Sequence, residues 1–353
     1  MFGYPTRKAS EDVVGGDAKR RRQTVGIVLG AGAARGWSHI GAIQELVAMG
    51  VSPSIVVGAS AGAVVGGCFA AGRLEQLEAF TRSLTKRRVF GLMDVSFNGG
   101  GLIGGNRLRV RLEESLGGMN IEDLPIRFAS VATEVGTGHE IWLKQGPLVD
   151  AMRASYALPG IFEPVRWGGR WLMDGALVNP VPVNVARAMG ADIVIAINIA
   201  SDVLTKGTAI QDPQHFIEEM ASEVALETEH GAPRSGGIMS GLSRGAAGLF
   251  RRQLAGGGGG APGIASVMAD AFNITQDRIM RSRLAGDPPD VLITARMTKI
   301  GLFEFHRADE LIALGREAAR KAIDELREHI DLTPPAKALP PAAASAELHS
   351  EAR

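Results

Sequence analysis

The part of this sequence that most restricts its fold is residues 26–43, which read "GIVLGAGAARGWSHIGAI". A hydrophobic run leads into a turn with three glycines (Gly30, Gly32 and Gly36), and a segment with helical spacing of apolar residues follows. A strand, a Gly-rich turn and a helix in this order aim backbone N–H groups at a negative charge. That charge belongs either to a bound phosphate or to a transition state.

The same alternation continues along the chain. Hydrophobic runs of strand length lie at 24–29, 53–58, 127–135, 192–199 and 290–296. Helical spacing marks 37–49, 61–72 and 307–330. Strands that alternate with helices predict an α/β fold, here a three-layer α/β/α sandwich with a mostly parallel central sheet.

Composition excludes several classes of function. The chain has 353 residues with 45% hydrophobic content, and Lys plus Arg equals Asp plus Glu at 38 each, so nothing indicates a nucleic-acid partner. The single cysteine, Cys68, excludes an intramolecular disulfide, and we expect it to be a small core residue. No apolar run approaches the roughly 18 residues of a spanning helix, and no leader-like segment opens the sequence. We therefore expect a cytoplasmic protein whose membrane contact, if any, is peripheral to the inner face.

Three segments are expected to lie outside the packed domain. Residues 1–22 and 332–353 are poor in large apolar side chains and predict disordered tails, basic at the N-terminus, around a single domain at 23–331. Residues 231–262 hold four arginines, eleven glycines and no acidic residue. They read as a Gly-rich surface insertion or as a basic amphipathic segment that docks at an anionic membrane. Liposome co-sedimentation with and without 231–262 distinguishes these two interpretations.

A second motif, "GASAG", places Gly58, Ser60 and Gly62 between a hydrophobic strand and a helix of small residues. This is the context of a nucleophile elbow, in which a serine sits on a strained turn at a helix N-terminus. A nucleophilic serine requires a base, and the seven histidines are badly placed for that role. His39 follows the Gly-rich turn directly, where capping or packing is expected. A carboxylate is available instead at Asp174, where the apolar strand in "RWLMDGALVNP" leads into a turn, and a turn-forming role is the alternative.

The motifs "GAGAARG", "GASAG" and "DGA", in this order and spacing, resemble the patatin-like phospholipases, most closely the small bacterial branch with a single domain. The segments "RGWSHIGAI", "RASYALPGIFEPV" and "NPVPVNVARAMGAD" are similar as well. The resemblance covers about residues 24 to 200 well and continues more weakly to about 330.

The resemblance implies a Ser/Asp dyad, with Ser60 as nucleophile and Asp174 as base, and an acyl-enzyme intermediate that water hydrolyses. It places the oxyanion hole at the Gly-rich loop, with the N–H groups around Gly32 and Ala33 facing the oxyanion, and the acid motif at Asp174, Gly175 and Ala176. The oxyanion-hole loop comprises Gly30, Gly32, Ala33, Arg35 and Gly36. Neither a metal nor a cofactor is implied. The substrate is a phospholipid, lysophospholipid or neutral acyl ester, with head group, acyl chain, regiospecificity, physiological role and oligomeric state left open.

The loop departs from the family at two positions, because Ala31 and Ala33 stand where the typical loop has more glycine. Alanine still donates its N–H, but it adopts a positive φ only at a cost. Arg35 matches the loop arginine of the family, whose expected role is to stabilise the loop or to meet a lipid phosphate.

Two other functions are weighed against a lipid hydrolase. A dinucleotide-binding protein also has a strand, a Gly-rich turn and a helix, but the glycines here follow G-x-G-x-x-x-G and the second strand ends without an acidic residue. A patatin-like scaffold that binds lipid or a regulator without turnover is the other alternative. The presence of both Ser60 and Asp174 argues against it.

Overall fold

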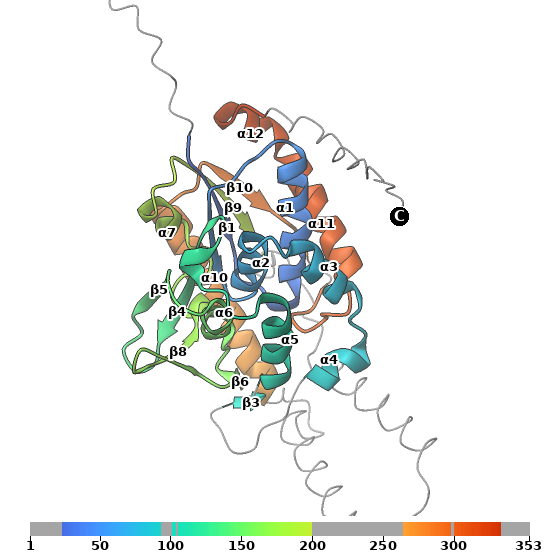
Figure 1. Cartoon of the computed structure of the whole chain (residues 1–353), viewed down its shortest axis with the longest axis vertical. Helices are drawn as coiled ribbons and strands as arrows, with labels where there is room; N and C mark the ends of the chain where they lie inside the picture. The colour runs from blue at the N-terminus through green and yellow to red at the C-terminus, as the bar shows by residue number, and fades with distance from the viewer. Residues whose placement is uncertain (1–22, 93–100, 104, 200–263, 298–299, 333–353) are drawn as a thin grey trace, which may run out of the picture.

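The computed structural model of this chain describes residues 23–92, 101–103, 105–199, 264–297 and 300–332 (Figure 1). The predicted tails and the insertion at 231–262 lie outside these ranges, apart from Leu332. None of the helices in the described ranges is long and apolar enough to cross a bilayer.

An eight-stranded sheet forms the centre of the fold, in the order β10-β9-β1-β2-β4-β8-β7, with β5 also paired to β4. Its strands are β1 (Val25–Leu29), β2 (Ile55–Ala59), β4 (Arg127–Glu134), β5 (Glu140–Leu143), β7 (Val165–Trp167), β8 (Arg170–Asp174), β9 (Ile193–Asn198) and β10 (Val291–Thr294). The strands β10, β9, β1, β2 and β4 run parallel, whereas β5, β8 and β7 join by antiparallel pairing. A separate pair is formed by β3 (Gly101–Ile103) and β6 (Gly160–Phe162). The predicted α/β fold with a mostly parallel sheet is confirmed.

Helices surround the sheet (Figure 1). The α-helices are α1 (Ser38–Ala48), α2 (Ala61–Ala70), α3 (Leu74–Arg82), α4 (Lys86–Leu92), α5 (Asn106–Leu116), α6 (Leu148–Tyr156), α7 (Val183–Ala188), α10 (Ile264–Gly286), α11 (Ala308–Lys321) and α12 (Ile323–His329). Short 3-10 helices are η1 (Ala33–Trp37), η2 (Ile121–Asp123) and η3 (Gly175–Leu177). The helix predicted over 307–330 is interrupted at Ala322, and the one predicted from 37 is an α-helix from Ser38, after η1.

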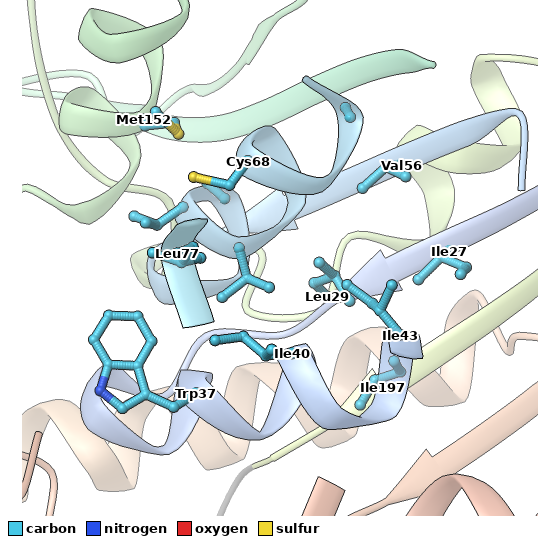
Figure 2. Packing of buried hydrophobic residues seen from close by; sticks show 14 of the residues in the cluster. Ile27, Leu29, Trp37, Ile40, Ile43, Val56, Cys68, Leu77, Met152 and Ile197 are labelled. Carbon is cyan, nitrogen blue, oxygen red and sulfur yellow. The ribbon is translucent and has the colours of Figure 1, made fainter. Parts of the chain in front are cut away.

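Successive strand residues enter two different cores, which is why the sheet carries helices on both faces. Ile27 and Leu29 of β1 pack with α1, α2 and α11, whereas Val28 between them packs with α7 and α10. Figure 2 shows the first core, with Ile40 and Ile43 of α1 beside Leu29. A strand that is buried on both faces has a continuous run of apolar residues in its sequence, and these runs made the strands predictable.

The helices α1 and α11 lie side by side along one face of the sheet (Figure 1). A Cβ atom at Gly41 would overlap the Ile312 carbonyl, and one at Gly315 would overlap the Ser38 carbonyl. Each helix therefore needs a glycine at the contact, which fixes α11 against the first turn of α1. This contact ties residues close to the C-terminus to the segment that follows the Gly-rich turn.

The register of β4 determines where β2 and β8 end. Ala59, the last residue of β2, pairs with Val131, and Asp174, the last residue of β8, pairs with Ala132. Because β5 pairs with Val131 and with Ala132 as well, it occupies the opposite edge of β4 from both of these strands. The strands β2 and β8 consequently meet end to end on one edge of β4, and the residue after β2 lies next to Asp174.

Candidate active site

Ser60 occupies the turn between β2 and α2 with a strained backbone. Its φ is 54° and its ψ is −122°, outside the regions that a serine prefers. The turn is tight because a Cβ at Gly58 would overlap the Gly62 carbonyl and one at Gly62 would overlap the Leu29 carbonyl. The two glycines predicted to flank the serine of a nucleophile elbow thus allow β1, β2 and α2 to converge beneath Ser60.

The Ser60 hydroxyl donates a hydrogen bond of 2.7 Å from Oγ to Oδ2 of Asp174. The other carboxylate oxygen, Oδ1, accepts the Ala176 N–H at 2.9 Å. Ser60 is 8% exposed and Asp174 only 1%. The structure therefore places in direct contact the two residues that the family resemblance pairs.

Burial changes the acidity of this carboxyl. Desolvation raises the pKa of Asp174 to about 7 from 3.8, against the hydrogen bonds from Ala176 and Ser60, which favour the carboxylate. A base with a pKa near 7 is matched to proton transfer at neutral pH. Asp174 can therefore take a proton from the hydroxyl that it contacts.

Two further side chains, which no sequence pattern singles out, hold the pair. Ser155, at the end of α6, accepts the Ser60 N–H at 2.9 Å and donates to the Val131 carbonyl at 2.6 Å. Thr133 donates to the Asp174 carbonyl at 2.8 Å. Ser155 lies in a segment with family-like sequence, but no spacing rule distinguishes it from other serines.

The Gly-rich loop presents two N–H groups that have no hydrogen-bond acceptor in the described part of the chain. Gly30 donates to the Ile197 carbonyl at 3.0 Å, Ala31 to the Pro180 carbonyl at 2.9 Å and Ala34 to the Leu302 carbonyl at 2.9 Å; Arg35 donates to the Gly32 carbonyl at 3.1 Å. The N–H groups of Gly32 and Ala33 remain. Of the loop residues predicted for an oxyanion hole, Gly30 and Arg35 thus have their N–H groups bonded elsewhere.

Ala33 has a φ of 49°, in the left-handed region where a Cβ is unfavourable. This alanine is one of the two positions, with Ala31, at which the loop departs from the glycine-rich pattern. The structure shows that the left-handed conformation is adopted nevertheless, at an energetic cost of about 1 kcal/mol.

Arg35 is buried, and its Nε donates to the Ile300 carbonyl at 3.0 Å. Burial lowers the pKa of its guanidinium to about 10, while Glu304 opposes that shift. Nearby, the indole of Trp37 donates to the Phe305 carbonyl at 3.2 Å. Arg35 therefore stabilises the loop by joining it to the segment between β10 and α11, one of the two roles expected for it.

The three sequence motifs converge in one small cluster. Ala31 of the Gly-rich loop, Ala59 before Ser60 and Ala176 after Asp174 pack together, with Phe272 of α10 against them. A Cβ at Gly36 would overlap that of Ala61, which brings η1 onto the start of α2. A Cβ at Gly175 would likewise overlap the Val131 carbonyl. Small residues are thus required here by the close approach of the three segments.

Within the described residues, the buried side chains of His39 and Cys68 make no hydrogen bond to Ser60 or Asp174. His39 bonds the Gly30 carbonyl, and burial lowers its pKa to about 4. Cys68 packs in the core near Met152 (Figure 2), and burial raises the pKa of its thiol to about 12, so the prediction of a core residue is confirmed.

No group of three or more His, Cys, Asp or Glu side chains gathers as a metal site within the described ranges.

Comparison with known proteins identifies the relatives of this chain. The model of the patatin-like phospholipase family matches residues 27–187. An uncharacterized NTE family protein of Mycobacterium tuberculosis is 32% identical over 328 residues, which is 85% of this chain and 91% of that protein. The mouse patatin-like phospholipase domain-containing protein 6 is 32% identical over 198 residues, 53% of this chain and 14% of its own length. Among solved structures, VipD from Legionella pneumophila aligns over 86% of this chain and 66% of its own at 14% identity and a TM-score of 0.40.

Proposed function

The chain belongs to the patatin-like phospholipase family, and we propose that it is a serine lipid acyl hydrolase that uses Ser60 and Asp174 as a catalytic dyad. Membership of this family supports lipid hydrolysis in general. Within that activity, we propose that the chain hydrolyses carboxylic esters in phospholipids, lysophospholipids or neutral lipids. The observation that carries it is the direct 2.7 Å bond from Ser60 Oγ to Asp174 Oδ2.

The proposed reaction begins with proton transfer. Asp174 takes the proton of Ser60 as Oγ attacks the ester carbonyl, and a tetrahedral oxyanion forms. Collapse of that intermediate releases the alcohol, which takes the proton from Asp174, and leaves an acyl-serine. Water then attacks the acyl-serine while Asp174 accepts its proton. Collapse of this second tetrahedral intermediate breaks the bond to Ser60 Oγ, which takes the proton back from Asp174, and the fatty acid is released.

The oxyanion requires donors that are already oriented before the reaction. We assign this role to the N–H groups of Gly32 and Ala33, because both lack an acceptor among the described residues while their neighbours are bonded. Removing one such donor typically costs about 3 to 4 kcal/mol of transition-state stabilisation. The helix α2, which starts directly after Ser60, adds a favourable dipole at the same place.

Labelling with a fluorophosphonate probe tests the nucleophile. We expect the wild type to react covalently and Ser60→Ala to remain unlabelled. Ser130→Ala is the matched control, because Ser130 is another buried serine near the same strand junction and donates only to the Ala151 carbonyl. Equal labelling of wild type and Ser60→Ala would remove Ser60 from the proposed role.

Release of fatty acid from a panel of lipids tests the reaction itself. A diacyl phospholipid, a lysophospholipid and a monoacylglycerol should each be offered to wild type and to Ser60→Ala. Hydrolysis that depends on Ser60 identifies the ester class. Binding of lipid by a folded wild type without release from any of them would favour the non-catalytic scaffold.

A further inference from the structure

His39 is a buried histidine that the proposed reaction does not use. It lies in the first turn of α1 with no exposed surface, and its Nε2 is 2.8 Å from the Gly30 carbonyl oxygen. A carbonyl oxygen only accepts hydrogen bonds, so the proton resides on Nε2. The other ring nitrogen, Nδ1, is buried with no hydrogen-bond partner among the described residues.

Packing does not explain a histidine at this position. A hydrophobic side chain of similar volume would fill the same space without an unpaired acceptor. The contact with Gly30, by contrast, requires a hydrogen-bond donor. The hydrogen bond to the Gly30 carbonyl is therefore the one contribution of His39 that a hydrophobic side chain could not make.

That bond holds one end of a single peptide group. The peptide between Gly30 and Ala31 is a rigid plane whose C=O is bonded to His39 and whose N–H is bonded to the Pro180 carbonyl. The Gly30 N–H, in the preceding peptide, donates to the Ile197 carbonyl. The orientation of this plane determines the direction in which the chain leaves β1 toward Gly32 and Ala33.

We propose that His39 is a positioning residue that acts through Gly30: its imidazole holds the Gly30–Ala31 peptide so that the Gly32 and Ala33 N–H groups face the oxyanion formed at Ser60. The inference rests on the proposed function, because it assigns a task within the same reaction. The side chain acts as a neutral donor, since burial lowers the pKa of its imidazole to about 4.

Two substitutions separate the hydrogen bond from the volume of the side chain. His39→Leu fills the space without a donor, and His39→Gln keeps an amide N–H at about the position of Nε2. Leu46→Ala is the control for stability, because Leu46 is fully buried on the same helix at the end remote from the loop. The assays are the rate of fluorophosphonate labelling and the kcat and KM for a soluble short-chain p-nitrophenyl ester.

We expect His39→Leu to lower kcat and the labelling rate by about 10- to 100-fold, the range that follows from small misplacement of catalytic groups, with KM nearly unchanged. His39→Gln should recover most of that loss, and Leu46→Ala should keep the wild-type kcat per folded molecule. An unchanged kcat in folded His39→Leu, or an equal loss in His39→Gln and Leu46→Ala, would overturn the positioning role.

The outcomes also distinguish this inference from the proposed function. Absence of Ser60 labelling in the wild type defeats the dyad, whereas wild-type labelling that is unaltered in His39→Leu defeats only the role of His39. If His39→Leu does not fold, ¹⁵N NMR of the imidazoles in the wild-type chain still tests the geometry. We expect the neutral Nε2–H tautomer for His39 at neutral pH, and an Nδ1–H tautomer or a protonated ring would refute it.

Discussion

Replacing Asp174 by asparagine removes the proposed base while keeping its shape. In the native site Oδ1 accepts the Ala176 N–H at 2.9 Å and Oδ2 accepts the Ser60 hydroxyl at 2.7 Å. The asparagine carbonyl oxygen must keep the bond from Ala176, so its NH₂ group faces Ser60 and donates to Oγ. The serine hydroxyl then has no group beside it that can take its proton.

The expected loss of rate is large. General-base catalysis contributes about 10²- to 10⁴-fold, which corresponds to about 2.7 to 5.4 kcal/mol of activation free energy. We therefore expect kcat for ester hydrolysis to fall at least about 100-fold in Asp174→Asn, with KM changed much less. The backbone contacts of residue 174 with Ala157 and Thr133 do not involve the carboxyl and should persist.

The assay is steady-state hydrolysis of a soluble ester by wild type, Asp174→Asn and Asp192→Asn. Asp192 is a suitable control because its carboxylate also accepts a backbone N–H, from Thr24 at 2.7 Å, but at the amino end of β9. Retention of more than about a tenth of kcat by Asp174→Asn, a change under roughly 1.4 kcal/mol, would refute the role of Asp174 as base.

At neutral and alkaline pH, the same substitution should raise the free energy of unfolding relative to the wild type. Burial raises the pKa of Asp174 from 3.8 to about 7, so the folded chain holds a proton that the unfolded chain releases between these values. Wild-type stability therefore falls as pH rises through this interval, by at most about 4 kcal/mol. Asparagine does not titrate. Urea unfolding should show Asp174→Asn gaining stability relative to wild type between about pH 4 and pH 8, and a constant difference would contradict the raised pKa.

Four further predictions follow from individual contacts. The wild-type kcat/KM should rise with pH through a midpoint near the Asp174 pKa of about 7, because only the carboxylate accepts a proton; a profile flat from about pH 5 to 9 would contradict this. Cys68→Ala should keep ester hydrolysis and lose about 1 kcal/mol of stability, measured by urea unfolding, since the thiol is a core group. Ala33→Gly should gain up to about 1 kcal/mol in the same assay and keep kcat, because it relieves the positive φ and keeps the N–H. His39→Gln should lose less stability than wild type on acidification from about pH 6.5 to 4, because burial lowers the His39 pKa to about 4 and folding opposes its protonation; equal losses would contradict this.

The sequence predicted the parallel half of the sheet well, and for a physical reason. Strands β1, β2 and β9 are bordered by turn residues and carry apolar side chains toward both cores, so their hydrophobic runs stand out, whereas β10 carries Val291 and Ile293 toward the first core only. The helix at 307–330 was predicted from its charged amphipathic pattern. Its interruption at Ala322 leaves that pattern unbroken and so was not visible.

The antiparallel strands β5 and β7 escaped prediction, and β8 was expected only as the apolar strand that leads into the turn at Asp174. These three strands are three to five residues long, and their side chains alternate between buried and exposed only partly; in β8, for example, the neighbours Arg170 and Trp171 are both exposed. Their pairing with β4 is what carries Asp174 to the end of β2. Sequence spacing alone could not bring Asp174 across 114 residues to Ser60; the family resemblance supplied that pairing.

In the proposed dyad, the arrangement on β4 allows Asp174 to activate Ser60 without a histidine between them. The end-to-end meeting of β2 and β8 places Ser60 Oγ in direct contact with Asp174 Oδ2, which leaves no space for an imidazole between them. An aspartate with an ordinary pKa of 3.8 would be a weak base toward a hydroxyl. Burial at the sheet junction raises that pKa to about 7, close to the 6.5 or so of a free imidazole. Desolvation of Asp174 by the surrounding sheet and alanine cluster thus gives the carboxylate the basicity that a histidine provides in a triad.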